Sequence, residues 1–470
     1  MIPSPFLSRR TALHRFGCGF GSLALAGLLG QNRPATGSQP APHLPPKAKR
    51  VIFLFMAGGV SQVDSFDYKP ALFQHDGQMR EFADLRALQR GEKTAPKFRV
   101  MKPLWEFKQR GQSGLWTSDL FPSIAGHMDD ICLLRSMHTE GVAHGPATLF
   151  LHTGAANFIR PSMGSWLLYG LGSESENLPG FVSIGPSLGN GGPRNYGNAF
   201  LPARFQGTAL GRAGAPLKEI AFRNISASRP PEAARRQFEL QQVLNAEQLE
   251  PGDTQLEAVL QSYELAWRMQ SHAPNVVDIQ RESAATRALY GIDEKGTDDF
   301  GRKCLMARQL SESGVRFVQV NYALNSSSNP AWDQHSNMPQ HAVHAQAVDK
   351  PIAGLLADLK ARGLLKDTIV WWGGEFGRTP YAEKNGTGRD HNPGGFTMWV
   401  AGGGFRPGHS HGATDEFGHY AIEDKVHMHD LHATLLHQLG LDHEKLTYRH
   451  DGRDYRLTDV HGDVVRDILA

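Results

Sequence analysis

The sequence predicts an α/β protein built on a doubly wound, mostly parallel sheet that is flanked by helices. The run VIFLFMAGG at 51–59 is continuously apolar and bounded by glycine, as is typical of a strand buried on both faces of a parallel sheet. In 303–322 and again in 351–374, a helical pattern leads into a short apolar strand. A repeated alternation of helix and buried strand favours this fold class.

The N-terminal segment predicts an address for the chain and not an element of the fold. Arg9 and Arg10 precede a modest, Gly-rich apolar stretch, so residues 1–30 predict a twin-arginine export signal. The stretch is shorter than the roughly 20 residues of a transmembrane helix, and we expect no integral span in the mature protein; an uncleaved anchor is the alternative. We therefore expect a periplasmic or extracellular protein.

After the signal, a Pro-rich linker at 31–50 leads into one domain over 51–470. Further strands are expected at 130–137 and 397–405. The stretch at about 225–295 is charged and amphipathic, which predicts a helical insertion that serves as scaffold.

The charge balance argues against nucleic acid or an anionic membrane as a partner. The chain has 49 Lys+Arg against 47 Asp+Glu and a formal net charge of +2, so a small substrate is the expected partner. Cys18 lies in the signal, which leaves Cys132 and Cys304 in the mature chain. An oxidising compartment permits a disulfide between them, but their apolar surroundings favour two buried free thiols.

Polar side chains follow the carboxyl ends of the predicted strands, where ligands bind in such sheets. Taken singly, each of these residues is more often a cap or a turn residue. Four groups at four strand ends of one sheet converge, however, and their oxygen and imidazole donors suit zinc, manganese or calcium. The groups are Ser61, Asp64 and Asp67; Asp333, His335, Asn337 and His341; Glu375 and Arg378; and Asp390 and His391.

Three segments carry a resemblance to known proteins. DTIVWWGGEFGRTP, GRDHNPGGFTMWVAGGGFRPG and DLHATLLHQLGLD look like the closing half of the alkaline phosphatase and sulfatase superfamily. Together, FMAGGVSQVDSFDYKP, GGEFGRTP and RDHNPGG resemble a secreted bacterial family known as domain-of-unknown-function 1501. The resemblance covers essentially the whole mature chain and implies an alkaline-phosphatase-like fold and a divalent metal cofactor, as one or two ions.

The resemblance implies metal ligands at some positions of this sequence and departs from the superfamily at others. Glu375 takes the place of a metal-binding Asp, while Phe376 stands where a second ligand is usual. His391 matches a late metal-binding His. Asp333 matches the first residue of an Asp-x-x-x-His pair; Asn337 replaces its His, and His335 or His341 is the substitute.

The first strand is a further departure from the superfamily. It normally ends in a metal-binding Asp, but here it ends in Ala57-Gly58-Gly59, so Asp64 or Asp67 would have to reach back to the metal. The expected metal ligands are therefore Asp64, Asp333, His335, Glu375 and His391.

His144 heads the predicted helix HGPATLFLHTG, where the superfamily has a nucleophilic Ser, Thr or modified Cys. The helix dipole disfavours a charged imidazole there, and a neutral one can ligate a metal, act as a base or attack phosphorus. Metal ligand or base is the first interpretation, nucleophile and plain packing the others. Arg378 is expected to clamp an anionic group, with a structural salt bridge as the equal alternative.

The sequence as a whole predicts an exported, metal-dependent hydrolase of phosphate or sulfate esters that uses metal-activated water on a small-molecule or glycan ester. Because the usual nucleophile is missing, two alternatives stay open. One is an inactive pseudoenzyme that binds a glycan or a protein. The other is a sulfatase with an unusual nucleophile.

Overall fold

The computed structural model of the protein describes residues 41–82, 95–215, 231–249, 254–324, 329–383 and 386–470. The chain divides into two compact units, Met1–Ala41 and Pro42–Ala470. The predicted export signal and most of the predicted linker lie outside the described residues. Within the described residues, no helix combines the length and the apolar character needed to cross a membrane.

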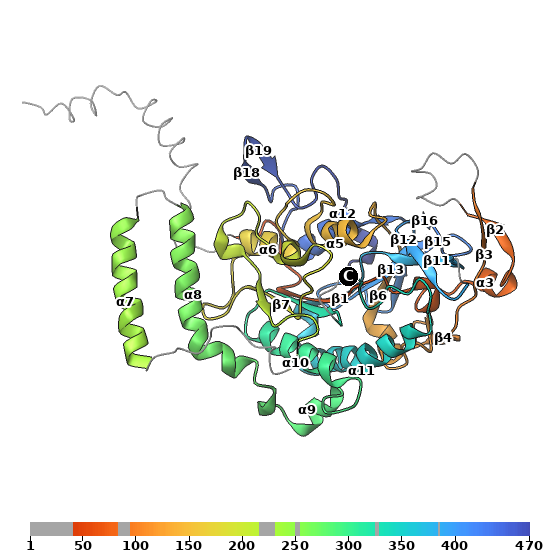
Figure 1. Ribbon diagram of the computed structural model, residues 1–470, viewed down its shortest axis with the longest axis horizontal. Helices are drawn as coiled ribbons and strands as arrows, with labels where there is room; N and C mark the ends of the chain where they lie inside the picture. The colour runs from red at the N-terminus through yellow and green to blue at the C-terminus, as the bar shows by residue number, and fades with distance from the viewer. Residues whose placement is uncertain (1–40, 83–94, 216–230, 250–253, 325–328, 384–385) are drawn as a thin grey trace, which may run out of the picture. The chain divides into compact units, whose positions relative to one another are not determined.

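A nine-stranded sheet forms the centre of the second unit (Figure 1). Strand β1, Arg50–Met56, lies between β10, Thr368–Gly373, and β9, Phe317–Tyr322, and is parallel to both. Among the described strands of this sheet, only β13, Phe396–Ala401, runs antiparallel to its neighbours, which confirms the predicted mostly parallel sheet. The other strands are β6 (Ile131–His138), β7 (Phe181–Ile184), β8 (Thr208–Leu210), β14 (His409–His411) and β17 (Val426–His427).

Helices cover both faces of this sheet, so β1 is buried from Val51 to Met56 and apolar throughout. Phe53 and Phe55 belong to the core on one face, and Ile52 and Leu54 to the core on the other. Figure 1 shows the two helical layers on opposite sides of the sheet. One layer contains α5 (His144–Thr153), α6 (Met163–Leu171) and α12 (Met428–Gln438); the other contains α10 (Asp298–Glu312) and α11 (Gln340–Ala361).

Helix α11 begins at Gln340, earlier than the predicted start at 351, and Pro351 lies inside it. Proline in a helix interior costs about 3 kcal/mol, which is why the sequence suggested a start there. The extra turns bury His341, His344, Ala345 and Val348, and this burial outweighs the cost of the proline.

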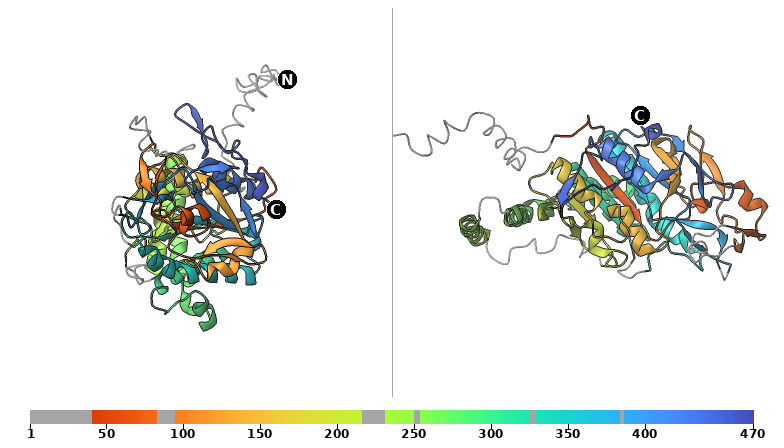
Figure 2. Two further views of the ribbon diagram at one scale, coloured as in Figure 1. Left: turned by 90° about the vertical axis from the view of Figure 1, so that its right-hand side faces the viewer. Right: turned by 90° about the horizontal axis from the view of Figure 1, so that it is seen from above.

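Where the structure describes it, the predicted insertion contains the α-helices α7 (Pro231–Gln248), α8 (Thr254–Val276) and α9 (Ala284–Leu289). Helix α7 packs on α8, and Phe238 stacks on Trp267 between them with ring centroids 5.0 Å apart. Helix α8 in turn contacts α10. Figure 2 shows this helical pair, in green, to one side of the central sheet.

Short two-stranded sheets, one short α-helix and several 3-10 helices complete the described fold. One of the sheets, β11 (Gly377–Ala382) with β12 (Arg389–Asn392), follows β10 and lies beyond its carboxyl end. The α-helix and the other sheets are α3 (Pro70–Gln74), β2 (Met79–Glu81) with β3 (Lys97–Arg99), β4 (Phe107–Arg110) with β5 (Leu115–Ser118), β15 (Ala413–Thr414) with β16 (Ala421–Glu423), and β18 (Tyr448–His450) with β19 (Arg453–Tyr455).

Cys132 and Cys304 are both free and buried, which confirms the prediction of two buried thiols. Burial raises the pKa of Cys132 to about 12 and raises the pKa of Cys304 as well. Because the thiolate is the reactive form, we expect iodoacetamide at neutral pH to alkylate neither residue in the folded protein and both in urea. Peptide mass spectrometry measures this; alkylation of either residue in the folded protein, or a peptide pair joined by a disulfide, would contradict it.

Candidate metal centre

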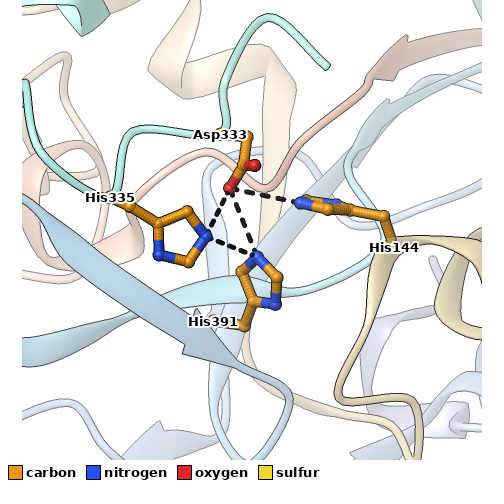
Figure 3. A group of neighbouring side chains, drawn as sticks. All are labelled: His144, Asp333, His335 and His391. Carbon is orange, nitrogen blue, oxygen red and sulfur yellow. Dashed lines mark hydrogen bonds and ion pairs between the residues drawn. The ribbon is translucent and has the colours of Figure 1, made fainter. Parts of the chain in front are cut away.

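Four of the predicted site residues meet beyond the carboxyl ends of the central strands (Figure 3). His144, Asp333, His335 and His391 each offer a ligand atom, and these atoms all lie within 4.8 Å of one another. The Nε2 atoms of His144, His335 and His391 lie 3.2, 2.9 and 3.2 Å from Asp333 Oδ1. We call these four residues the metal cluster.

Separate segments of the chain supply the metal cluster. His144 is the first residue of α5, as predicted, and Gly154 ends that helix in a left-handed conformation with φ 68°. Asp333 and His335 lie in the loop between β9 and α11, and His391 lies on β12. The cluster therefore exists only when the helix, the loop and the small sheet are all in place.

Each histidine of the cluster is held from behind through its Nδ1 atom. Glu375 Oε1 lies 2.6 Å from Nδ1 of His144, and the backbone oxygen of Val142 lies 2.9 Å from Nδ1 of His391. Nδ1 of His335 contacts Glu383. An oxygen acceptor behind each ring fixes the ring orientation and leaves Nε2 facing the centre, as in the outer shell of protein metal sites.

The hydrogen bonding of the three rings fits a bound cation. Because carboxylate and carbonyl oxygens only accept, we assign the ring proton of each neutral histidine to Nδ1. Three Nε2 lone pairs then face one another and an ionised carboxylate, with Nε2 of His335 only 3.0 Å from Nε2 of His391. Such a set of acceptors is repulsive unless a cation or extra protons lie among them, and imidazole with carboxylate is a donor set that zinc and manganese accept.

Charges in the cluster shift the pKa values of its members. Burial lowers the pKa of His144, but hydrogen bonds with Asp333 and Glu375 outweigh this and raise it to about 9. The sequence predicted a neutral His144 at the helix N-terminus. In the metal-free protein His144 is instead charged at neutral pH, because the two carboxylates outweigh the helix dipole. Burial acts to raise the pKa of Asp333, but its contacts with the three histidines outweigh burial and lower it. Burial lowers the pKa of His391 to about 4. The charges of Arg378 and His144 act in the same direction, and the hydrogen bond with Asp333 opposes them.

Glu375 supports the cluster from behind, although the sequence predicted it as a ligand. Both of its carboxylate oxygens lie 3.0 Å from the backbone nitrogen of Gly58, and Oε1 also meets His144. Burial acts to raise the pKa of Glu375, but the interactions with His144 outweigh it, so this pKa is lowered and the group stays ionised. Its charge therefore orients His144 and is not presented to the centre.

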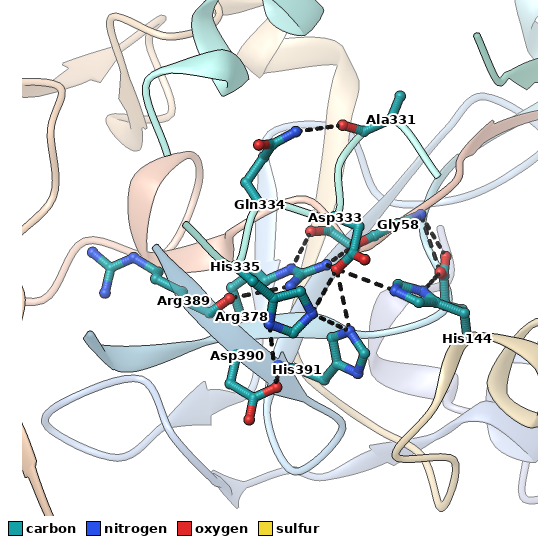
Figure 4. A network of polar contacts seen from close by, with 12 residues as sticks. Gly58, His144, Ala331, Asp333, Gln334, His335, Arg378, Arg389, Asp390 and His391 are labelled. Atoms are coloured by element: carbon teal, nitrogen blue, oxygen red, sulfur yellow. Dashed lines mark hydrogen bonds and ion pairs between the residues drawn. The ribbon is translucent and has the colours of Figure 1, made fainter. Parts of the chain in front are cut away.

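Arg378 is fully buried, and its position does not match the predicted anion clamp (Figure 4). Its Nη2 donates to Asp333 Oδ1 at 2.6 Å and to the backbone oxygen of Gly58. Its Nε donates to the oxygen of Gly59 at 3.1 Å, and its Nη1 to the oxygen of Arg389 at 3.1 Å. The guanidinium is thus engaged by the protein on all three nitrogens, which corresponds to the structural alternative.

Two glycines follow β1 at points where the backbone approaches neighbouring segments closely. A Cβ on Gly58, which has φ 115°, would lie 2.7 Å from the backbone nitrogen of Asp333. A Cβ on Gly59, which has φ 79°, would lie 2.9 Å from the backbone oxygen of Phe376. The strand end therefore approaches its neighbours through the backbone alone. The ring of Phe376, at which the sequence predicted that a donor is lost, stacks on His391 with 4.4 Å between the ring centroids.

Asp64 was also predicted as a ligand, and in the structure it is not part of the metal cluster. One carboxylate oxygen accepts from Arg389 Nε at 2.7 Å and from Ser61, and the other accepts from the backbone nitrogen of Leu104 at 3.0 Å. Asp64 and Arg389 are both fully buried. This aspartate neutralises a buried guanidinium, and neither of its oxygens faces the centre.

Other residues near the strand ends have structural contacts. Asp67 accepts from Thr414 and pairs with Lys69 at 3.3 Å, and buried His341 accepts from the backbone of Ser61 at 3.3 Å. Glu383 was not among the site residues predicted from the sequence. The signal was the β11–β12 hairpin, whose pairing of Ala382 with Arg389 brings Glu383 back toward the cluster.

A second group that could hold a cation shares His335 with the metal cluster. It consists of His335, Glu383 and Asp390, whose ligand atoms also lie within 4.8 Å of one another. Nδ1 of His335 lies 3.7 Å from Asp390 Oδ1.

Comparisons with known proteins come from solved structures and a family model. Similar structures include the sulfatase PsFucS1 from Pseudoalteromonas sp., at 13% identity over 96% of this chain and 75% of that chain, with a TM-score of 0.35. The phosphonate monoester hydrolase SpPMH from Silicibacter pomeroyi has 12% identity over 74% of this chain and 71% of that chain, with a TM-score of 0.34. Alkaline phosphatase from the Antarctic bacterium TAB5 has 10% identity over 76% and 92%, with a TM-score of 0.31.

No curated protein matches the chain. A family model described as "Protein of unknown function (DUF1501)" matches residues 48–469, which is almost all of the second unit.

The buried pair of Asp64 and Arg389 predicts a large effect on stability. Asp64→Ala leaves the Arg389 guanidinium buried without a counter-ion, so we expect the free energy of unfolding to fall by about 3–5 kcal/mol. Urea denaturation measures this change. The double variant Asp64→Ala/Arg389→Met, which removes both charges, should recover part of the loss. A stability of Asp64→Ala within about 0.5 kcal/mol of the original would contradict the assignment.

The raised pKa of His144 predicts a pH dependence of stability in the metal-free protein. A group whose folded pKa is raised contributes stability below its unfolded value, about 6.5, and loses it as the pH rises through the folded value, about 9. Relative to His144→Asn, the metal-free protein should lose up to about 3 kcal/mol between these pH values. Urea denaturation of both proteins at each pH is the measurement, and equal losses in both would refute it.

Proposed function

The chain belongs to the DUF1501 family, and from this premise and the geometry of the metal cluster we propose that it is an exported, metal-dependent hydrolase of phosphate or sulfate esters. The observation that carries the proposal is the convergence of three Nε2 atoms on Asp333, with an oxygen acceptor behind each ring. His144, Asp333, His335 and His391 are the proposed ligands, and zinc or manganese is the proposed ion.

A divalent cation held by these residues supplies Lewis-acid polarisation of an ester oxygen and of water. The chain's own groups prepare the donors. Arg378 helps to keep Asp333 ionised, Glu375 aims Nε2 of His144 at the centre, and the lowered pKa of His391, about 4, keeps its Nε2 free of a proton at neutral pH. Phe376 covers one face of His391 and excludes water from that side.

His144 is assigned as a ligand in this proposal. Its side chain is 11% exposed, and its Nε2 faces Asp333 at 3.2 Å, which favours a role at the cluster over plain packing. As a ligand it replaces the nucleophile of the superfamily that the sequence resembles, so direct attack by water on the ester follows.

The engaged state of Arg378 favours a second candidate function. Because its nitrogens are committed to Asp333 and to backbone oxygens, it cannot reach a charged ester without breaking these bonds. Charge neutralisation then depends on the ion alone. A protein that binds metal and a glycan or protein partner without hydrolysis is therefore the alternative to an enzyme.

Export is the part of the proposal that depends on residues 1–30. Arg9 and Arg10 ahead of an apolar stretch support the twin-arginine route to the periplasm or the exterior. A small-molecule or glycan ester from that space is the proposed substrate.

Metal content tests the cluster directly. We expect elemental analysis of the purified protein, after incubation with zinc or manganese, to find stoichiometric metal. His335→Ala/His391→Ala removes two proposed ligands and should contain none. We expect hydrolysis of 4-nitrophenyl phosphate or 4-nitrophenyl sulfate to fall by about 100-fold or more in this variant and after chelation, since the bound ion activates the attacking water.

His450→Ala is the matched control, because His450 lies on β18 outside the metal cluster, and its metal content and turnover should stay unchanged. If metal is bound but neither ester is hydrolysed, the enzyme proposal fails and the binding alternative stands. If the original protein binds no metal, both forms of the metal proposal are refuted.

A further inference from the structure

A cavity adjoins the metal cluster on the side of the sheet that carries α5. The space between its lining atoms, with the open solvent at its mouth included, is about 510 Å³, and the enclosed part of that space is small. Thr148 of α5, Gln319 and Asn321 of β9, and Asn195 from the segment after β7 contribute to its wall. Glu375 also lines it, so a single carboxylate separates this cavity from His144 and the cluster.

One face of α5 connects the cluster to the cavity. His144, Thr148 and His152 are spaced four residues apart and therefore lie along the same face of the helix. The first belongs to the metal cluster, the second lines the cavity, and the third lies 2.9 Å from Gln319 below it. A ligand in the cavity would thus lie one helical turn from the cluster.

Buried amides form a polar network in a part of the sheet that is otherwise apolar. Nε2 of Gln319 donates to Nε2 of His152 at 2.9 Å and to Oδ1 of Asn321 at 2.7 Å. Burial lowers the pKa of His152 to about 4, so its ring is neutral and accepts this bond. Nδ2 of Asn321 donates to Oγ of Ser183 at 3.1 Å and to the backbone oxygen of Ile184 at 2.8 Å. The network uses both donors of Gln319.

Two amide oxygens of the cavity wall have no hydrogen-bond donor among the described residues. They are Oε1 of Gln319, which is 2% exposed, and Oδ1 of Asn195, which is 8% exposed. The amide nitrogen of Asn195 is already used, since it donates to the backbone oxygen of Asn190 at 3.1 Å. A buried oxygen without a donor destabilises the fold by about 1–3 kcal/mol, so we expect each oxygen to accept a hydrogen bond from a ligand or from water.

The charge of the wall restricts what that ligand is. The described residues that line the cavity include no Lys, Arg or His, and the one charged residue among them is the carboxylate Glu375. An anionic group would meet acceptors and a negative charge there. A neutral group with hydroxyl donors would satisfy both free oxygens and meet no repulsion.

We propose that this cavity is a subsite for the neutral, hydroxyl-bearing part of the ester, such as a vicinal diol, while the anionic group lies at the metal cluster. This inference rests on the proposed function and specifies its substrate class as an ester of a polyol or sugar. Asn195 and Gln319 recognise the hydroxyl groups through their amide oxygens.

The test compares two esters that differ only in their hydroxyl groups. We expect the metal-loaded protein to hydrolyse glycerol 3-phosphate with a kcat/KM at least about tenfold above that for propyl phosphate, because a site built for hydroxyl donors rejects the analogue that lacks them. In Asn195→Leu this ratio should fall toward one. Asn195→Asp keeps an acceptor oxygen at the same place and should keep the preference, whatever its effect on both rates.

Ala323→Leu is a second variant, which tests the role of the cavity without removing a polar group. Ala323 lines the cavity at the end of β9, and a larger side chain fills it, so the preference for glycerol 3-phosphate should also fall. An equal kcat/KM for the two esters in the original protein overturns the proposal, as does an unchanged ratio in both cavity variants.

Binding separates a failure of this inference from a failure of the proposed function. Saturation-transfer NMR should detect glycerol but not 1-propanol on the original protein, and should lose the glycerol signal in Asn195→Leu. If neither ester is hydrolysed, the hydrolase proposal fails, and the glycerol signal still decides the subsite. Absence of that signal from the original protein overturns it.

Discussion

The buried guanidinium of Arg378 joins three parts of the chain that must meet for the site to form. Its donors reach the end of β1 at Gly58 and Gly59, the loop that carries Asp333, and β12 at Arg389. A charge this deeply buried is tolerated only with several acceptors around it. The same bonds that stabilise the charge also hold Asp333, and the three histidines converge on Oδ1 of this residue. Fold stability and the geometry of the centre therefore depend on one side chain.

Much of this arrangement could be predicted from the sequence. Continuous apolar runs identified the central strands, because helices cover both faces of the sheet and bury β1 from Val51 to Met56. The rule that polar residues beyond parallel strands converge also found Asp333, His335 and His391, and the helix ending in Thr153-Gly154 led back to His144. The positions of Asp333, His335 and His391 follow from element order, whereas that of His144 came from the resemblance to the superfamily.

The sequence could not divide the charged residues between ligands and supports. Three charged residues follow strand ends just as the cluster residues do, yet each is bound to a buried partner. Asp64 pairs with Arg389, Glu375 binds His144 and the backbone of Gly58, and Arg378 binds Asp333 and backbone oxygens. The partners of Asp64 and Glu375 lie more than 200 positions away and that of Arg378 lies 45 positions away, so no local pattern encodes them. Helix α11 was shortened in the prediction for a related reason, since the burial of its first turns outweighs the local penalty of Pro351.

The residues of the metal cluster come from distant parts of the sequence, and this affects how long the folded protein resists proteolysis. In an unfolded chain only Asp333 and His335 are neighbours, while His144 and His391 are far away in sequence. An ion that needs all four donors binds the folded chain in preference to the unfolded one, so its occupancy adds to the free energy of unfolding by mass action. For the proposed ion, its free concentration around the protein would then set how rarely the chain opens to proteases, and metal starvation would shorten the lifetime of the protein.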